Sequence, residues 1–208
     1  MKKDSWLIDP IKITNFKATD FELELMILFW VAAAGKNGVT AAQCLRNMLV
    51  HWAERIIGSF PHPGCETFTP FDVIRFMCDE GVGLADEMKK FGIGCYRSKS
   101  TAFLQLAFSQ MNLRVCSLDA LENIHGIGPK TARCFLIHSR PRMKLAGLDT
   151  HILKYMRDQG FEVPKSTPSG KKYREIEKQF IGLAKKAKKS IAAFDLAIWN
   201  NYRNKKHV

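Results

Sequence analysis

A tight turn at Gly126-Ile-Gly-Pro129 constrains the fold of this chain more than any other feature, because stretches with helical spacing of apolar residues flank it on both sides. Glycine readily adopts left-handed backbone angles. Proline suits the first position of a helix, where its missing N–H leaves no bond unmade. Upstream, Leu118 and Leu121 repeat at helical spacing after Ser117, a candidate N-cap. The sequence therefore predicts a helix, a tight turn and a second helix over about residues 117 to 140.

The same turn is predicted to bind phosphate. Its glycines and the start of the second helix leave backbone N–H groups without partners and facing solvent, and such groups favour an anion. Gly126, Gly128 and Thr131 are therefore candidate contacts to a DNA backbone, and Lys130 lies in the first turn of the same helix.

The rest of the chain is predicted to be almost entirely helical. Apolar residues follow a helical period over 21–34, after a candidate cap at Asp20, and in a helix that opens at Thr40. Further helices are expected at 71–80, 84–91, 96–111, 172–188 and 190–202, with breaks rich in proline and glycine at 61–70 and 161–171. Strand signals are few, so the expected fold class is all-α.

The charge distribution favours a polyanionic partner. The 208 residues carry a net charge of +12. Residues 161–208 contain 12 lysines and arginines against 4 acidic residues, whereas the first 160 residues contain 20 against 16. Clustered positive charge attracts nucleic acid through long-range electrostatics. The lysine run at 185–189 is equally consistent with a solvated helix face, and both interpretations stay open.

The cysteine pattern and the N-terminus indicate a reduced, cytoplasmic protein. The six cysteines are spread 13 to 21 residues apart without a Cys-x-x-Cys pair, so neither a metal site nor a disulfide framework is expected. No secretory signal is recognisable at the N-terminus. The most apolar run, Leu25–Ala34, is too short to span a membrane, so no membrane partner is expected.

Three motifs between Gly94 and Ile152 resemble, in the same order, those of the helix-hairpin-helix superfamily of base-excision DNA glycosylases. They are Gly94-Cys-Tyr-Arg-Ser-Lys99, the hairpin Gly126-Ile-Gly-Pro-Lys130-Thr-Ala, and Leu148-Asp-Thr-His-Ile152. The resemblance covers Phe91 to Gly160 closely and the rest of the chain more loosely. It implies an all-α fold of two helical subdomains with the active cleft between them.

The resemblance also assigns the subdomains. One would comprise about residues 24–140 and contain the helix-hairpin-helix at 117–140. The other would combine residues 1–23 with 141–208 and carry the aspartate and the basic C-terminal helices. Lys130 and Asp149 would then face each other from different subdomains.

Lys130 and Asp149 are the candidate catalytic residues. A carboxylate near the anomeric carbon stabilises the positive charge that develops on the sugar when a glycosidic bond breaks. A neutral lysine amine can attack that carbon, expel the base and form an imine, from which β-elimination nicks the strand. This chemistry requires the pKa of Lys130 to fall, which burial favours and a nearby carboxylate opposes. Alternatively, Lys130 could only contact the DNA backbone, and Asp149 could only cap the helix that begins at Thr150.

Other site residues follow from the resemblance alone. Relatives place a gap-filling polar residue where this chain has Lys36 and Asn37, although an ordinary turn between helices would look the same. The C-terminus resembles that of small archaeal-type 8-oxoguanine glycosylases, so Asp195 and Trp199, with Lys205 and Lys206, could form a base pocket. The alternative is that this last helix merely packs. Because no cysteine follows Cys134, no iron–sulfur cluster and no other cofactor are expected.

The function predicted on these grounds is a bifunctional DNA glycosylase and AP lyase of base-excision repair. Its partner would be double-stranded DNA with a damaged base, with 8-oxoguanine as the leading substrate and oxidised pyrimidines or another damaged purine as alternatives. A competing hypothesis is a helix-hairpin-helix protein that binds DNA without catalysis. We expect a monomer in the cytoplasm, associated with the nucleoid if the source is prokaryotic.

Overall fold

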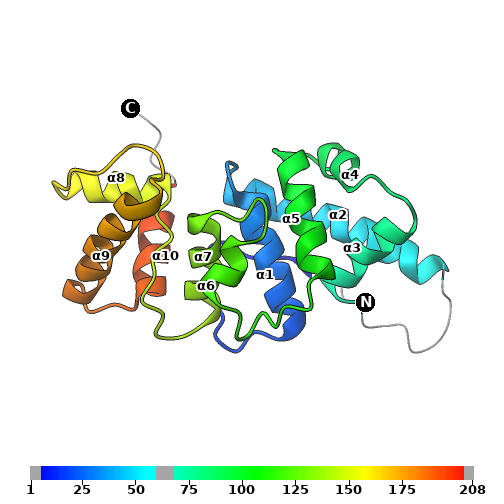
Figure 1. Cartoon of the computed structure of the whole chain (residues 1–208), viewed down its shortest axis with the longest axis horizontal. Helices are drawn as coiled ribbons and strands as arrows, with labels where there is room; N and C mark the ends of the chain where they lie inside the picture. The colour runs from blue at the N-terminus through cyan, green and yellow to red at the C-terminus, as the bar shows by residue number, and fades with distance from the viewer. Residues whose placement is uncertain (1–5, 60–67, 204–208) are drawn as a thin grey trace. The chain divides into compact units, whose positions relative to one another are not determined.

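The structure is a computed structural model that describes residues 6–59 and 68–203. Every regular element within these two ranges is a helix, and neither range contains a strand, which confirms the all-α prediction. Helices α1 to α10 belong to two compact units, labelled in Figure 1. No helix among the described residues is long and apolar enough to cross a membrane.

Unit 1 comprises the chain up to Ile13 and Ala18–Ile127. Its helices are α1 (Asp20–Ala33), α2 (Gly38–Ser59), α3 (Pro70–Asp79), α4 (Leu84–Lys90), α5 (Tyr96–Phe108) and α6 (Leu118–Glu122). Helix α1 contacts α2, α3 and α5, and α5 also packs against α3 and α4. Fully buried side chains such as Leu28, Met48, Ile74 and Phe103 fill this core.

Unit 2 combines the short segment Thr14–Lys17 with Gly128–Val208. Its helices are α7 (Pro129–Ser139), α8 (Thr150–Asp158), α9 (Gly170–Lys186) and α10 (Ile191–Tyr202), coloured from green to red in Figure 1. Helix α10 contacts the other three. The apolar cluster of this unit includes Leu148, Ile152, Tyr173, Phe180 and Ile198.

Local capping explains where several helices begin. The Ser117 side chain accepts from Ala120 N, and Pro129 occupies the first turn of α7, as predicted. The predicted cap at Asp20 is wrong: Asp20 is already helical, and Thr19 caps α1 through a capping box with Glu22. Thr19, one residue earlier, is the cap because its hydroxyl and the Glu22 carboxylate together accept hydrogen bonds from two backbone N–H groups.

The division into units differs from the expected subdomains at α7. The motifs predict that residues up to 140 belong to the first subdomain, whereas the structure groups α7 with the C-terminal helices and ends unit 1 at Ile127. Lys130 and Asp149 therefore belong to the same compact unit. The chain passes from unit 1 to unit 2 within the Gly-x-Gly turn itself.

Candidate active site

The turn before α7 depends on Gly126. This residue has φ of +88°, and an added Cβ would come within 2.9 Å of the Ser98 backbone oxygen on α5. The same turn is held by His125 N, which donates to Gln105 Oε1 at 2.7 Å. Gly126 is thus required by its backbone angle and by the close approach of another helix.

Gly128 has a different role from Gly126. It is the N-cap residue of α7 and provides no side-chain cap, and an added Cβ would meet nothing within 4 Å. The first N–H groups of a helix have no acceptor within that helix. The exposed end of α7 therefore presents donors, although the Thr131 side chain is itself buried.

Lys130 lies in the first turn of α7, is half-buried, and is surrounded by acidic groups of unit 2. Its ammonium group interacts electrostatically with Cys134, one turn further along α7, with Asp149 at the start of α8, and with Asp195 on α10. The structure thus brings together the two residues predicted to be catalytic and one predicted to form the base pocket.

The pKa of Lys130 is raised above its usual value, opposite to the fall predicted from the sequence. Burial disfavours the ammonium and acts to lower this pKa, but the electrostatic interactions with Cys134, Asp149 and Asp195 outweigh it. Burial also raises the pKa of the Cys134 thiol well above its usual range, so this thiol is neutral near pH 7. We therefore assign the raised lysine pKa to the two carboxylates.

Asp149 caps α8 and also interacts electrostatically with Lys130. Its side chain caps α8, with Oδ1 accepting from Ile152 N at 2.8 Å. Burial raises the pKa of this carboxyl, Lys130 lowers it, and Asp195 raises it again. The result is a carboxyl that holds a proton more readily than an exposed aspartate while lying in the field of the lysine.

A buried salt bridge connects the two chain segments that carry Lys130 and Asp149. Glu177 Oε1 on α9 accepts from Arg133 Nε and from the backbone N–H of Ala146, both at 2.8 Å. Arg133 and Glu177 are 6% and 7% exposed. Because Arg133 follows Lys130 on α7 and Ala146 precedes Asp149, one carboxylate holds both segments.

Further contacts fix the segment before Asp149. The Tyr173 hydroxyl accepts from Leu148 N at 3.0 Å and donates to Ala146 O at 2.8 Å, while Thr167 donates to Leu148 O at 2.9 Å. The Arg133 guanidinium lies 4.6 Å from the centre of the Tyr173 ring. We call Arg133, Tyr173 and Glu177 the α7–α9 clamp. It fixes the backbone on which Asp149 is mounted.

Gly147 shows how closely this segment approaches α7. An added Cβ at this position would overlap the Cys134 Sγ atom. Only glycine fits here, and its absence of a side chain allows residues 146–148 to pass directly over the helix that carries Lys130.

Asp195 has one satisfied and one unsatisfied oxygen. Its Oδ2 lies 3.2 Å from His138 Nε2, whereas Oδ1 is buried and has no hydrogen-bond partner among the described residues. A buried acceptor without a partner is costly. Trp199, one turn further along α10, contacts the His151 ring edge-on and the Arg203 guanidinium at 5.0 Å.

The other candidates have intramolecular partners or lie outside the described residues. Lys36 Nζ donates to Gly92 O, and Asn37 Oδ1 accepts from Val39 N and Thr40 N at the start of α2. Lys205 and Lys206 lie outside the described residues. Within the described ranges, no group of three or more His, Cys, Asp or Glu residues could hold a metal ion.

Sequence reasoning missed Arg133, Cys134, Tyr173 and Glu177. Cys134 could have been found, because residues four apart share one face of a helix and Lys130 was already a candidate. The α7–α9 clamp had no local signal, since its partners are 25 to 44 residues apart in the chain.

Comparison with known proteins identifies similar sequences and folds. Residues 86–189 match the family model described as 8-oxoguanine DNA glycosylase. A stretch of 79 residues is 37% identical to the 8-oxoguanine DNA glycosylase/AP lyase of Picrophilus torridus, and covers 38% of this chain and 37% of that relative. The match thus spans little more than a third of the curated relative. The crystal structure of the 8-oxoguanine DNA glycosylase of Thermotoga maritima shares the fold, with a TM-score of 0.61 and 21% identity, over 93% of this chain and 86% of that one.

Proposed function

This chain belongs to the 8-oxoguanine DNA glycosylase family, and we propose that it is a bifunctional DNA glycosylase and AP lyase acting on double-stranded DNA. The proposed substrate carries a damaged base, with 8-oxoguanine first among the candidates. We further propose that it acts in the cytoplasm as a monomer, without a metal or iron–sulfur cofactor.

The observation that carries this proposal is the electrostatic group formed by Lys130, Asp149 and Asp195 beside the exposed start of α7. Three elements of unit 2 contribute to it, and the α7–α9 clamp holds two of them. These residues supply a nucleophile, a carboxylate that can stabilise the sugar cation and a buried acceptor for the base, which together suit base excision with strand cleavage.

In the proposed reaction, the neutral Lys130 amine attacks C1′ of the damaged nucleotide. The N–C1′ bond forms as the glycosidic C–N bond breaks, and the electron pair leaves with the base, which takes up a proton. Asp149 stabilises the positive charge on the sugar during this step. Opening of the sugar ring gives an imine, and loss of a C2′ proton then expels the 3′ phosphate. Water finally hydrolyses the imine and frees the lysine.

The raised pKa of Lys130 means that the resting enzyme holds an ammonium that must lose its proton before attack. Asp149 is the proposed acceptor, because burial raises its pKa and thereby makes its carboxylate a stronger base than an exposed one. It then gives this proton to the departing base, so that the carboxylate is ionised again as positive charge develops on the sugar. The phosphates at the start of α7 would be held by the first N–H groups of that helix.

We propose that Asp195 Oδ1 accepts a hydrogen bond from an N–H group of the flipped base. This oxygen is buried without a partner among the described residues, so a donor from the base would remove an existing cost. A flipped base is commonly recognised by hydrogen bonds and by stacking, and Trp199 is the proposed aromatic neighbour.

Borohydride trapping on a duplex with an abasic site or 8-oxoguanine tests the covalent step. The wild-type protein should give a reduced crosslink, and Lys130→Gln should lose at least about 1,000-fold in trapping rate because the nucleophile is gone. Lys171→Gln, an exposed lysine on α9, should trap like wild type. A wild-type protein that binds these duplexes without any crosslink or nick would instead be a DNA-binding module.

A panel of duplexes with single lesions tests the choice of base. Release of 8-oxoguanine faster than of oxidised pyrimidines or other damaged purines supports the proposed substrate. Preference for another lesion would leave the proposed lyase reaction unchanged and would make that lesion, instead of 8-oxoguanine, the substrate.

A further inference from the structure

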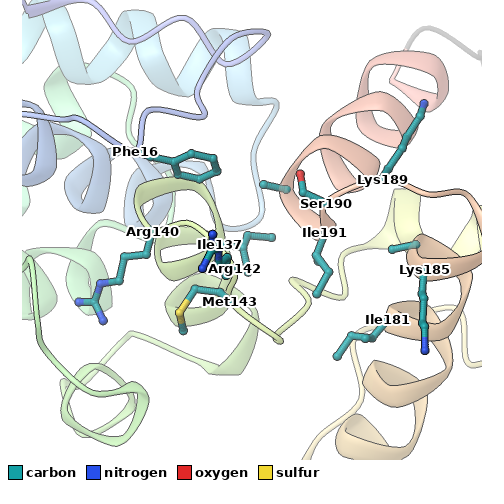
Figure 2. Close-up of a pocket in the computed structure, with 12 residues that line it drawn as sticks. Phe16, Ile137, Arg140, Arg142, Met143, Ile181, Lys185, Lys189, Ser190 and Ile191 are labelled. Atoms are coloured by element: carbon teal, nitrogen blue, oxygen red, sulfur yellow. The ribbon is translucent and has the colours of Figure 1, made fainter.

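A cavity of about 350 Å³ lies in unit 2 at the end of α7 that is distant from Lys130. Residues from α7 and the following loop face residues from α9 and α10 across it (Figure 2). The apolar side chains around it include Phe16, Ile137, Met143, Ile181 and Ile191. This volume is at the lower end of the range for ligand sites, about 300 to 1,000 Å³.

The rim of this cavity is positively charged. Arg140, Arg142, Lys185 and Lys189 line it, and its lining within the described residues includes no Asp or Glu. The flanking sequence extends the same charge: residues 139–148 contain three lysines and arginines, residues 178–194 contain five lysines, and neither segment has an acidic residue. An anionic partner would therefore meet no local repulsion.

One wall of the cavity is fixed by hydrogen bonds within unit 2. The Thr14 hydroxyl lies 2.7 Å from His138 Nδ1, and Asn15 N donates to His138 O at 2.9 Å. These bonds attach the segment before α1 to the end of α7 and set Phe16 beside the cavity, with 44% of this residue exposed. A wall that is already formed reduces the entropy that a ligand must lose on binding.

The cavity is separate from the candidate active site. Lys130 and Arg140 are ten residues apart along α7 and its C-cap, which corresponds to about 15 Å at 1.5 Å per residue. None of Lys130, Asp149 and Asp195 lines the cavity. Its occupant therefore need not be the damaged nucleotide.

We propose that this cavity binds an acidic peptide segment of a partner protein, with one bulky apolar side chain inserted between Phe16 and Ile191 and carboxylates at the basic rim. The apolar interior argues against a nucleic acid backbone, because a phosphate placed there would lose its water without gaining hydrogen bonds. An exposed apolar patch with a polar rim is typical of a protein interaction site. The inference goes beyond the proposed glycosylase activity and does not depend on it.

Fluorescence anisotropy with a labelled synthetic peptide tests this proposal. The probe has a central Leu-Phe pair flanked by Asp and Glu residues. A second peptide keeps the acidic residues and replaces Leu-Phe with Gly-Ser, and a third keeps Leu-Phe and replaces the acids with Asn and Gln. The first peptide should bind at least about tenfold more tightly than either of the others, since both the apolar and the charged groups are needed.

Protein variants locate the binding. The double variant Lys185→Glu/Lys189→Glu should weaken binding of the first peptide at least about tenfold, and Phe16→Ser should weaken it without a change of charge. The matched control is Lys171→Glu/Lys178→Glu, which makes the same charge change at exposed positions of α9 outside the cavity. It should change the affinity less than about threefold. Thermal melting shows whether each variant is folded.

Three results would overturn the proposal. Equal binding of the acidic peptides with and without Leu-Phe would reduce the effect to general electrostatic attraction. An equal loss of affinity in the two double variants would exclude a defined site. If undamaged duplex DNA displaces the peptide, and Lys185→Glu/Lys189→Glu weakens DNA binding more than peptide binding, the cavity rim is a nucleic acid contact.

Discussion

The two ends of α7 differ in the charges of the residues that surround them. At its start, one half-buried cation, Lys130, is surrounded by the carboxyls of Asp149 and Asp195, and a buried salt bridge lies one turn away. At its other end, Arg140 and Arg142 join lysines of the α9–α10 region around a cavity whose described lining includes no acidic residue. Mixed charge that is buried adjusts the protonation of single groups, whereas like charge that is exposed attracts a partner.

This difference has a consequence for mutations. Changes at the start of α7 should alter chemistry, stability or both, because the groups there have buried partners. Changes at the far end should alter binding only, because its cations are half-buried or exposed. Substitutions in and around the start of α7 can test whether it behaves in this way.

The largest expected effect is on stability, for Glu177→Gln. This substitution leaves the Arg133 guanidinium buried without its carboxylate, which should cost about 3 to 5 kcal/mol. Urea unfolding measures the change. Glu175→Gln on the same helix removes a carboxylate that is half-exposed and 3.9 Å from Lys172, and should cost less than about 1 kcal/mol. Equal losses for the two variants would show that the α7–α9 clamp adds nothing to stability.

Asp149→Asn should separate capping from catalysis. Asparagine caps helices as well as aspartate does, so the melting temperature should change little. Loss of the charge that stabilises the sugar cation should slow base release by about 100-fold to 1,000-fold. Single-turnover release from an 8-oxoguanine duplex measures this rate. Unchanged release with a normal melting temperature would leave Asp149 as a cap alone.

Gly126→Ala should destabilise the turn that leads into α7 by about 1 to 3 kcal/mol, because alanine at φ of +88° is strained and its Cβ would press on Ser98 O. Gly128→Ala, with φ of −87° and open space around the added atom, should be close to neutral. Thermal unfolding compares the two variants. Equal melting temperatures would contradict a structural requirement for glycine at position 126.

The smallest effect expected is a shift in pH dependence for Asp195→Asn. The Asp195 carboxylate raises the pKa of Lys130, so its removal lowers that pKa and increases the neutral amine at a given pH. The trapping rate should then rise at a lower pH than in wild type. An abasic duplex is the substrate, because it has no base for Asp195 to bind. Glu162→Gln, an exposed change on a loop, should leave the profile unmoved.

Local features of the fold were predictable from the sequence, and features that depend on distant partners were not. Ser117, Pro129 and Asp149 act at helix starts through atoms within a few residues, so their patterns were sufficient. The cap of α1 was misplaced by one residue, since Thr19 and Asp20 are both good caps and only the reciprocal bond with Glu22 decides between them.

The candidate site was predictable in its residues and not in its electrostatics. The motif order named Lys130 and Asp149, but the direction of the lysine pKa depends on whether burial or two carboxylates dominate. That balance needs distances across α7, α8 and α10. The lysine run of the C-terminal region shows the same limit, because only the fold separates Lys185 and Lys189, which line a cavity, from Lys186 and Lys188, which are exposed and do not line it.

The close packing of Gly147 on Cys134 makes this cysteine a natural reporter of motion. The thiol is buried, and no reagent can reach it while residues 146–148 cover α7. Alkylation of Cys134 therefore requires the covering segment to lift, so the labelling rate measures how often the backbone before Asp149 opens. Mass spectrometry can measure the rate of Cys134 labelling in the intact protein. Slower labelling in the presence of DNA would show that DNA binding keeps residues 146–148 closed over α7.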